Sequence, residues 1–389
     1  MTQAYRIAVI AAFLSYSSGY AGYVMPGLLA GMIVEAVTGR LRWVSTVMDR
    51  SLVLLLAAVT LSGLGSAWRG ESLGLGVLFA LMAAVSIYPA ARLAWEHPAA
   101  IRQVAPAWIA GAIGAAAWGI VRAPATWPSG ASTPALLGTA LGTTLAAAVA
   151  LALGAWTVWR RPALRAALAA GLVVMVTALT LTTSRSAWIA AAIGSVIVVA
   201  LTPRARLGLV LLCAASVAVA MAATQAERSW LEHRIESIPS LAANADRVAI
   251  WRGAMRMIRD HPLTGIGYGT FVRAWPQYHD EPGLEGKPTA HNVFLNFAAE
   301  TGLLGLAAFL AVVGTGFAAL WRRVRTSRGD PEVDGLWTGV FAAMAAVMMQ
   351  QLFDATIMSW HVGYALLAVF ALAGPVGSRD AHGIRVPAT

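Results

Sequence analysis

The residues of this chain that are best suited to chemistry lie in and around one long polar stretch, 224–290, in an otherwise apolar sequence. Together with its closing residues, Ala290-His291-Asn292, the stretch holds four of the seven histidines and a cluster of arginines. Ionisable groups at the edge of a bilayer are costly unless they bind something. Guanidinium groups bind phosphate well, and histidine titrates near neutral pH. The stretch therefore indicates a site for an anionic, lipid-linked substrate at a membrane surface.

Three residues are the main candidates, and each has a structural alternative. His291 opens an apolar run, where a histidine serves either as a base or as a capping or interfacial residue. Arg247 projects at the margin of an apolar helix face and needs an anionic partner, either a structural carboxylate or a bound phosphate. Arg185, in Thr183-Ser184-Arg185-Ser186, is a phosphate ligand or a snorkelling anchor, although outer anchors are more often aromatic.

Residues 247–260 predict an amphipathic helix that stops at Pro262. At about 100° per residue, one face is apolar and the opposite face is cationic. The apolar face comprises Val248, Trp251, Met255 and Ile258, and the cationic face comprises Arg252, Arg256 and Arg259. The cationic face is either a solvated or headgroup-facing stripe, or part of a substrate site.

Three alternating glycines follow in the run Pro262-Leu263-Thr264-Gly265-Ile266-Gly267-Tyr268-Gly269. The spacing is not GxGxxG, and no strand–helix context surrounds it. The run therefore predicts a tight turn at the membrane surface, and contact of its backbone amides with a ligand remains an alternative.

The sequence argues against a metal or another cofactor. It contains no HExxH, CxxC or P-loop pattern, and the outer stretch has no DxD or ExD pair. His279-Asp280-Glu281 is the one alternative cation site, in a Pro/Gly-containing segment. Metal-dependent sugar transfer is therefore not supported, and we expect the site to hold no metal.

The composition is that of an integral membrane protein. Of the 389 residues, 58% are hydrophobic and 12% are charged, against about 25% charged in soluble domains. The length fits one polytopic domain, 1–389. A net charge of +10 would point to nucleic acid in a soluble protein, but here it indicates loop charges that set topology. We therefore expect membrane lipids and no nucleic acid as partners.

Apolar runs long enough to cross a bilayer predict an all-α polytopic fold with about twelve transmembrane helices. They lie at about 4–19, 22–38, 51–68, 72–92, 101–121, 133–157, 164–182, 186–201, 206–223, 291–320, 336–353 and 357–375. With the N-terminus inside, the cytoplasmic segments hold many arginines and the short outer loops hold only Arg69, Arg122 and Arg185. Such asymmetry follows the positive-inside rule. The segment 224–290, between the ninth and tenth helices, is then outside, which in a bacterial inner membrane is the periplasm.

Several motifs together resemble the O-antigen ligase / O-antigen polymerase superfamily. They are Arg247-x3-Trp251, Asp260-His261-Pro262-Leu263-Thr264-Gly265-Ile266-Gly267-x-Gly269-Thr270-Phe271, His291-Asn292-x-Phe294-Leu295 and Glu300-Thr301-Gly302-Leu303-Leu304-Gly305. Thr183-Ser184-Arg185-Ser186 resembles the earlier arginine motif of that superfamily. The matching block runs from about 170 to 310, and the helix layout extends the resemblance over nearly the whole chain.

The resemblance implies a metal-independent membrane C-type glycosyltransferase that moves glycan from an undecaprenyl-diphosphate carrier to an acceptor. By the matching motifs, Arg185 and Arg247 bind the diphosphate and His291 acts at the acceptor, with inversion. Among family activities, the chain length and the His291-Asn292 signature favour O-antigen ligation to lipid A–core. We further predict substrate contacts for Arg252, Arg256, Tyr268, Asn292 and Asp354, the last at an outer turn shared with His361.

Other functions remain in view. Within the superfamily these are O-antigen polymerase and protein O-oligosaccharyltransferase. A flippase or transporter for lipid-linked sugars would place charges along a central path through several helices, whereas here nearly all charge lies in loops. A non-catalytic scaffold would not need Arg185, Arg247 and His291 together.

Overall fold

The computed structural model describes residues 1–16, 21–122, 138–222, 232, 235–236, 245–280, 283–284, 286, 289–358 and 360–375. This described part is helical, apart from an isolated bridge between Thr46 and Pro375. Its α-helices are α1 (Gln3–Tyr16), α2 (Ala21–Val37), α3 (Asp49–Gly65), α4 (Arg69–Glu96), α5 (Ile101–Arg122), α6 (Thr139–Val158), α7 (Pro162–Leu181), α8 (Arg185–Leu201), α9 (Arg206–Ala222), α11 (Ala245–Asp260), α12 (Phe271–Ala274), α13 (Val293–Thr326), α14 (Asp334–Gln350) and α15 (Trp360–Ala373).

The helices are those of a multi-pass membrane protein. Five are long and apolar enough to cross a bilayer: Arg69–Glu96, Ile101–Val121, Thr139–Val158, Pro162–Leu181 and Val293–Thr326. Shorter apolar helices lie at Gln3–Ser15, Val24–Val37, Arg185–Leu201 and Val362–Ala373. The all-helical membrane class expected from the sequence is thus confirmed, whereas twelve crossings and the orientation of 224–290 stay predictions. Most of 223–244 lies outside the described residues.

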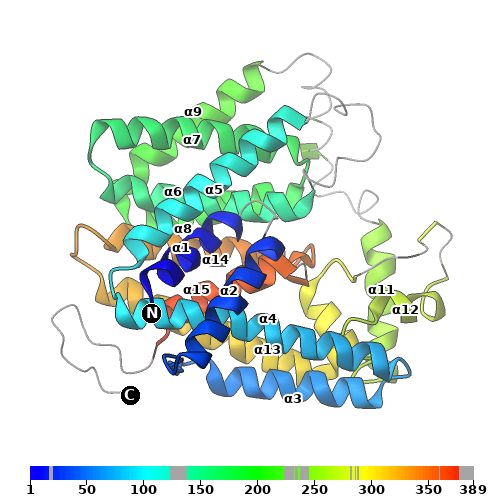
Figure 1. Cartoon of the computed structure of the whole chain (residues 1–389). Coiled ribbons are helices and arrows are strands. Elements are labelled where there is room, and N and C mark those ends of the chain that lie inside the picture. The colour runs from blue at the N-terminus through cyan, green and yellow to red at the C-terminus, as the bar shows by residue number, and fades with distance from the viewer. Residues whose placement is uncertain are drawn as a thin grey trace.

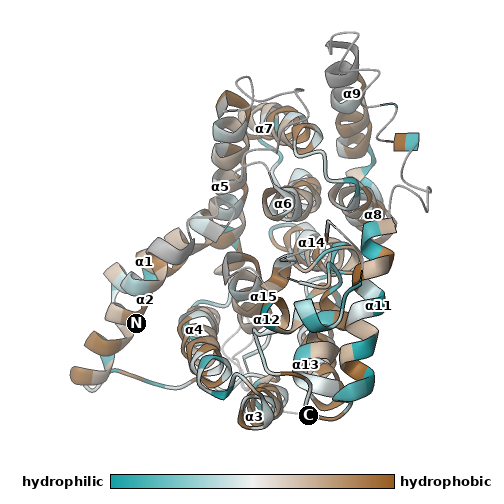
Figure 2. Ribbon diagram, turned by 90° about the vertical axis from the view of Figure 1, so that its right-hand side faces the viewer, coloured by the Kyte–Doolittle hydropathy of each residue, from teal (hydrophilic) through white to brown (hydrophobic). Residues whose placement is uncertain are grey.

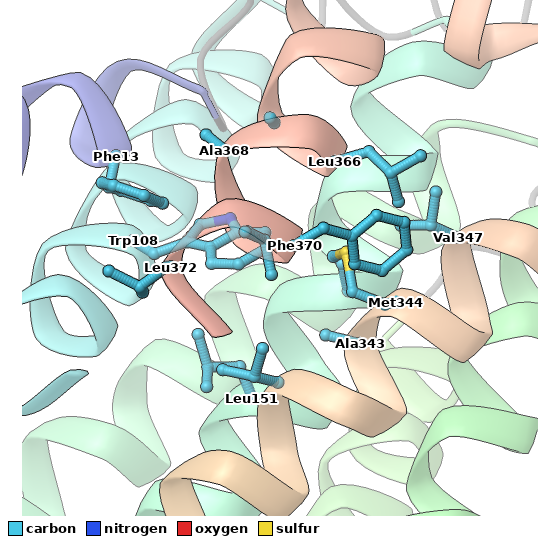
Figure 3. Close-up of a cluster of buried hydrophobic side chains, with 14 of the residues drawn as sticks. Phe13, Trp108, Leu151, Ala343, Met344, Val347, Leu366, Ala368, Phe370 and Leu372 are labelled. Carbon is cyan, nitrogen blue, oxygen red and sulfur yellow. The ribbon is translucent and has the colours of Figure 1, made fainter. Parts of the chain in front are cut away.

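Helix α6 forms the centre of the bundle, and every residue from Gly142 to Trp156 is buried. It packs against α14 and α8. The approach to α14 is close because Gly154 faces Gly335 and Gly339, and a Cβ on Gly154 would lie 2.3 Å from the Gly335 carbonyl oxygen. Beside this contact, side chains of α6, α14 and α15 join one apolar core, which Figure 3 shows around Phe370.

A buried ion pair joins α2 to α4. Glu35 and Arg92 are both almost fully buried, and the Arg92 guanidinium donates to the Glu35 carboxylate and to the Tyr88 hydroxyl. The sequence predicted that this helix ends at about residue 92, but α4 continues to Glu96, so Arg92 lies inside the helix. Burial is possible because the opposite charge of Glu35 is also buried beside it.

Helix α11 lies outside the main bundle, at the end shown on the right of Figure 1, and its hydrophilic side is visible in Figure 2. Its apolar face differs from the predicted one. The buried residues are Ala249, Ile250, Gly253, Ala254 and Met257, whereas Met255 is 54% exposed. The small residues decide this orientation, because they allow the helix to approach the Trp275 ring closely.

Helix α13 is broken at Gly302, where φ is 68° and ψ is −175°. The glycine-containing run after α11 fills the break. Leu303 N–H donates to the Pro262 carbonyl, and Gly267 N–H donates to the Glu300 carbonyl. A Cβ on Gly302 would lie 2.1 Å from the Leu263 carbonyl oxygen, so no other residue type fits this contact. The loop and the break together fix α11 relative to the start of α13.

Candidate functional site

Arg185 begins α8, and a tight connection from α7 positions it. Ser184 is the N-cap, and its hydroxyl accepts from the Ala187 N–H at 3.4 Å. This segment packs on the start of α6, since a Cβ on Gly142 would lie 2.9 Å from the Ala187 Cβ and 3.4 Å from the Ser184 Cβ. The arginine motif is therefore held at the Thr139 end of α6.

The loop after α14 reaches the same end of α6. The Gln350 side chain donates to the Thr139 carbonyl at 3.3 Å, and the Thr143 and Thr356 hydroxyls are 3.0 Å apart. The start of α13 joins this group because Val293 N–H donates to the Gln351 carbonyl at 3.0 Å. The segments that carry Arg185, Asp354 and His291 thus converge at one end of the bundle.

The central contact of the site joins His291 and Asp354. The His291 Nδ1 atom lies 3.5 Å from the Asp354 Oδ1 atom, with the carboxylate nearly buried and the imidazole about one-third exposed. Burial alone would raise the pKa of Asp354. The His291 hydrogen bond, the Ala355 N–H and the charges of His291 and Arg247 instead lower this pKa below its usual value. The contact involves Nδ1, so Asp354 does not engage the second ring nitrogen of His291, Nε2.

Arg247 acts on the Asp354 carboxylate through its charge, and no direct ion pair of its guanidinium is found within the described residues. It is half-buried at the border of the inner face of α11, and its charge helps to lower the pKa of Asp354. The sequence left a structural carboxylate and a bound phosphate as alternative partners for Arg247. The charge of Arg247 lowers the pKa of Asp354, the carboxyl group that also contacts His291.

Backbone strain accompanies two of the predicted site segments. Thr183 (φ 58°) and His291 (φ 48°) are the two non-glycine residues with positive φ in the described part of the chain. Such conformations cost free energy and concentrate at functional sites. His291 consequently lies outside α13, two residues before its first turn, rather than opening it as the sequence suggested.

Asn292 has a structural role as an N-cap. Its side-chain oxygen accepts from the Phe294 and Leu295 N–H groups, both at 3.0 Å. Its side-chain nitrogen donates to the Leu352 carbonyl at 3.0 Å. Asn292 therefore ties the histidine segment to the Asp354 loop.

The other predicted contacts are dispersed. Arg252 is exposed. Arg256 forms an ion pair with Asp280 at 2.6 Å, and Asp280 is one of the residues of the alternative cation site.

Tyr268 lies between the rings of Phe79 and Phe297, and burial raises its pKa. Glu281 and the side chain of His361 lie outside the described residues. Within the described residues, no cluster of three or more metal-ligating side chains occurs.

Glu300 is an organising residue that sequence reasoning treated only as part of a motif. Its carboxylate is buried and accepts from the N–H groups of Gly269, at 3.0 Å, and Phe271, at 3.1 Å. The amides of the glycine-containing turn thus bind a carboxylate of the protein itself. The predicted tight turn is confirmed, and its place at the membrane surface stays a prediction. The signal was a carboxylate inside an apolar run, which requires a partner.

Two cavities with mainly apolar walls flank the site. One, of about 250 Å³, extends from Thr289 and Tyr268 between α13 and α15 to Val312. The other, of about 660 Å³, lies between α7, α8 and α9, with Glu232 and Ile235 also at its wall. Trp188, Ala192 and Ser195 line it and follow Arg185 at helical spacing, so they share one face of α8 with Arg185.

The fold and the site define a class, a helical membrane protein with arginines and a histidine–carboxylate pair at one end of its bundle. Residues 170–310 match the family model described as O-antigen ligase, which confirms the resemblance predicted from the motifs. The chain is also 27% identical over 130 residues to the exopolysaccharide production protein ExoQ of Rhizobium meliloti (strain 1021). That alignment covers 31% of this chain and 28% of the relative.

Proposed function

We propose that this protein is a metal-independent, inverting glycan ligase of the membrane. In this proposal it transfers glycan from an undecaprenyl-diphosphate carrier to a sugar hydroxyl of lipid A–core at the periplasmic face of the inner membrane. The observation that carries the proposal is the His291–Asp354 contact, with the charge of Arg247 acting on the same carboxylate. The family match over residues 170–310 supports the reaction class.

The donor side of the proposed reaction rests on the arginines. A glycosyl diphosphate has a good leaving group, so the reaction needs charge stabilisation of the departing diphosphate more than it needs a general acid. Arg185 and Arg247 supply this through charge-assisted hydrogen bonds, in place of a cation. The carrier tail lies in the larger cavity, because its lining residues share the α8 face of Arg185.

The acceptor side rests on His291. The imidazole Nε2 takes the proton of the acceptor hydroxyl while the new C–O bond forms and the bond from the anomeric carbon to the diphosphate oxygen breaks. The electron pair of that bond leaves with the diphosphate, and Asp354 stabilises the imidazolium that forms. A single displacement of this kind inverts the anomeric configuration.

The test separates binding from transfer. Undecaprenyl-diphosphate binding and glycan transfer to lipid A–core are measured for wild type and His291→Ala, with the exposed His261→Ala as the matched control. We expect the His291 variant to bind the carrier normally and to lose transfer by about 10²- to 10⁴-fold. The control should behave as wild type.

Two results would count against this mechanism. If His291→Ala loses carrier affinity as severely as Arg247→Ala, the histidine is a diphosphate ligand and not the base. If excess chelator abolishes transfer and magnesium or manganese restores it, metal independence is wrong, and attention moves to Asp280 and Glu281.

A second candidate function is glycan polymerisation, in which the acceptor is another carrier-linked glycan. The similarity to a relative named for exopolysaccharide production favours it. Supplying either lipid A–core or a second carrier-linked glycan as the acceptor in the same assay distinguishes the two functions.

A further inference from the structure

The loop between α14 and α15 must hold the Asp354 carboxylate against His291 without help from a regular helix. Gln351, the first residue of this loop, is fully buried. Gln351 follows the C-terminal end of α14, and its side chain is uncharged. An apolar residue would serve equally well if the side chain only filled space. Its hydrogen bonds show a more specific arrangement.

Gln351 uses every polar part of its side chain. The Oε1 atom accepts from the Ile357 N–H at 2.9 Å, and Nε2 donates to the Val347 carbonyl at 3.1 Å and to the Thr356 hydroxyl at 2.8 Å. Asp354 lies midway between Gln351 and Ile357 in sequence. One side chain thus ties the far end of the loop to the end of α14.

The same residue also anchors the histidine segment. The Gln351 carbonyl accepts from the N–H of Val293, which is two residues after His291. The adjoining Leu352 carbonyl accepts from the Asn292 side chain. Residues 351–352 therefore anchor both the segment of His291 and the loop of Asp354. The Thr356 hydroxyl in turn contacts the Thr143 hydroxyl of α6.

We infer that Gln351 is a positioning residue that sets the His291–Asp354 geometry and acts on transfer through Asp354. The inference rests on the proposed function, because it assigns to Gln351 the support of the proposed base. His291 contacts Asp354 directly, so a displaced loop would separate the carboxylate from the imidazole. Misplacement by about 1 Å is enough to cost about a hundredfold in rate.

Gln350 supplies a matched control. It is the same residue type, equally buried and adjacent in sequence. Its side chain makes one hydrogen bond, to the Thr139 carbonyl at 3.3 Å, and its Oε1 atom has no partner among the described residues. It does not bridge the loop, so its replacement should not move Asp354.

The experiment compares Gln351→Leu with Gln350→Leu in purified full-length protein, alone and combined with Asp354→Asn. Transfer kinetics are measured against the undecaprenyl-diphosphate-linked donor, and thermal unfolding reports folding. We expect Gln351→Leu to lower kcat about 10- to 100-fold with the donor KM unchanged, and Gln350→Leu to stay within about threefold of wild type. In the Asp354→Asn background, Gln351→Leu should add little further loss, because both changes remove the same contact.

A more conservative variant, Thr356→Val, controls for loss of activity through misfolding. Thr356→Val removes only the hydroxyl that accepts from Gln351 and contacts Thr143, and it should lower kcat in the same direction by a smaller factor. Full activity of Gln351→Leu, or losses that multiply with those of Asp354→Asn, would refute the positioning role while leaving the proposed function standing. Retention of transfer by His291→Ala would instead refute the proposed mechanism itself.

Discussion

At the scale of single residues, the site depends on charge placed around Asp354. The carboxylate is nearly buried, and it remains ionised because His291, the Ala355 N–H and Arg247 compensate its burial. The arginine that the sequence placed at the margin of an apolar face therefore contributes to the same electrostatic group as the histidine that follows 44 positions later.

Arg247→Ala tests the proposed diphosphate contact. If the contact strengthens as the carrier departs, we expect transfer to fall about a hundredfold, equivalent to about 3 kcal/mol. Arg247→Lys should recover only part of the loss, because an ammonium group does not reproduce the planar fork of arginine. The exposed Arg259→Ala, on the same helix, is the control, and equal losses in both variants would contradict a specific role for Arg247.

Asp354 should also contribute to stability in a pH-dependent way. Because its pKa in the folded protein is lowered, its contribution is present above the unfolded value of about 4 and is lost as the pH falls through the folded pKa. We expect the difference in thermal stability between wild type and Asp354→Asn to be constant from about pH 8 to 5 and to shrink below about pH 4. A difference that grows on acidification would contradict this.

At the scale of elements, two features position the site. The break in α13 locks the glycine-containing turn through Glu300, and the face of α8 that begins with Arg185 continues into the larger cavity. The break in α13 fixes the position of α11 and therefore of Arg247. The α8 face connects the end of the bundle that carries Arg185 with the larger apolar cavity.

Gly302→Ala tests the break. The new Cβ would meet the Leu263 carbonyl oxygen at 2.1 Å, and alanine is strained at a φ of 68°. We expect a loss of about 2–4 kcal/mol in the free energy of unfolding, measured by thermal or chemical denaturation in detergent. Gly314→Ala, in the same helix with open space around the new Cβ, should be neutral or slightly stabilising.

Ala192→Phe tests the proposed carrier groove. The phenyl ring would fill part of the larger cavity and displace carrier tail, so we expect the donor KM to rise about tenfold, as for the loss of about two buried methylenes. Ala200→Phe places the same ring on an exposed position of α8 away from the cavity lining. Unchanged donor kinetics for Ala192→Phe would place the tail elsewhere.

At the scale of the whole molecule, the proposed site draws on segments spread from residue 185 to residue 354. Arg185, Arg247, His291 and Asp354 come from the start of α8, from α11, from the residue before the N-cap of α13 and from the loop after α14. The small residues of α6 and α14 allow the close crossing on which this convergence depends.

The orientation of the molecule is tested by reporter fusions. A reporter after Arg259 should be periplasmic, and reporters after Arg161 and Arg325 should be cytoplasmic, as the arginine distribution predicts. A cytoplasmic signal at Arg259 would overturn the site proposal, because the proposed lipid-linked donor is presented on the outer face.

The helical membrane class, the helix positions and the motif segments were predictable from the sequence, because long apolar runs and short motifs are local properties of the chain. The buried face of α11 was not predictable in this way. Its small residues Ala249, Gly253 and Ala254 pack on the side of the Trp275 ring, and this close packing outweighs the burial of the more hydrophobic Met255. The His291–Asp354 contact, the bridging by Gln351 and the capture of Glu300 by backbone amides depended on the tertiary structure, because each joins residues from different segments. Residue types can be read along the chain, but the pairing of distant polar groups follows only from how the helices pack.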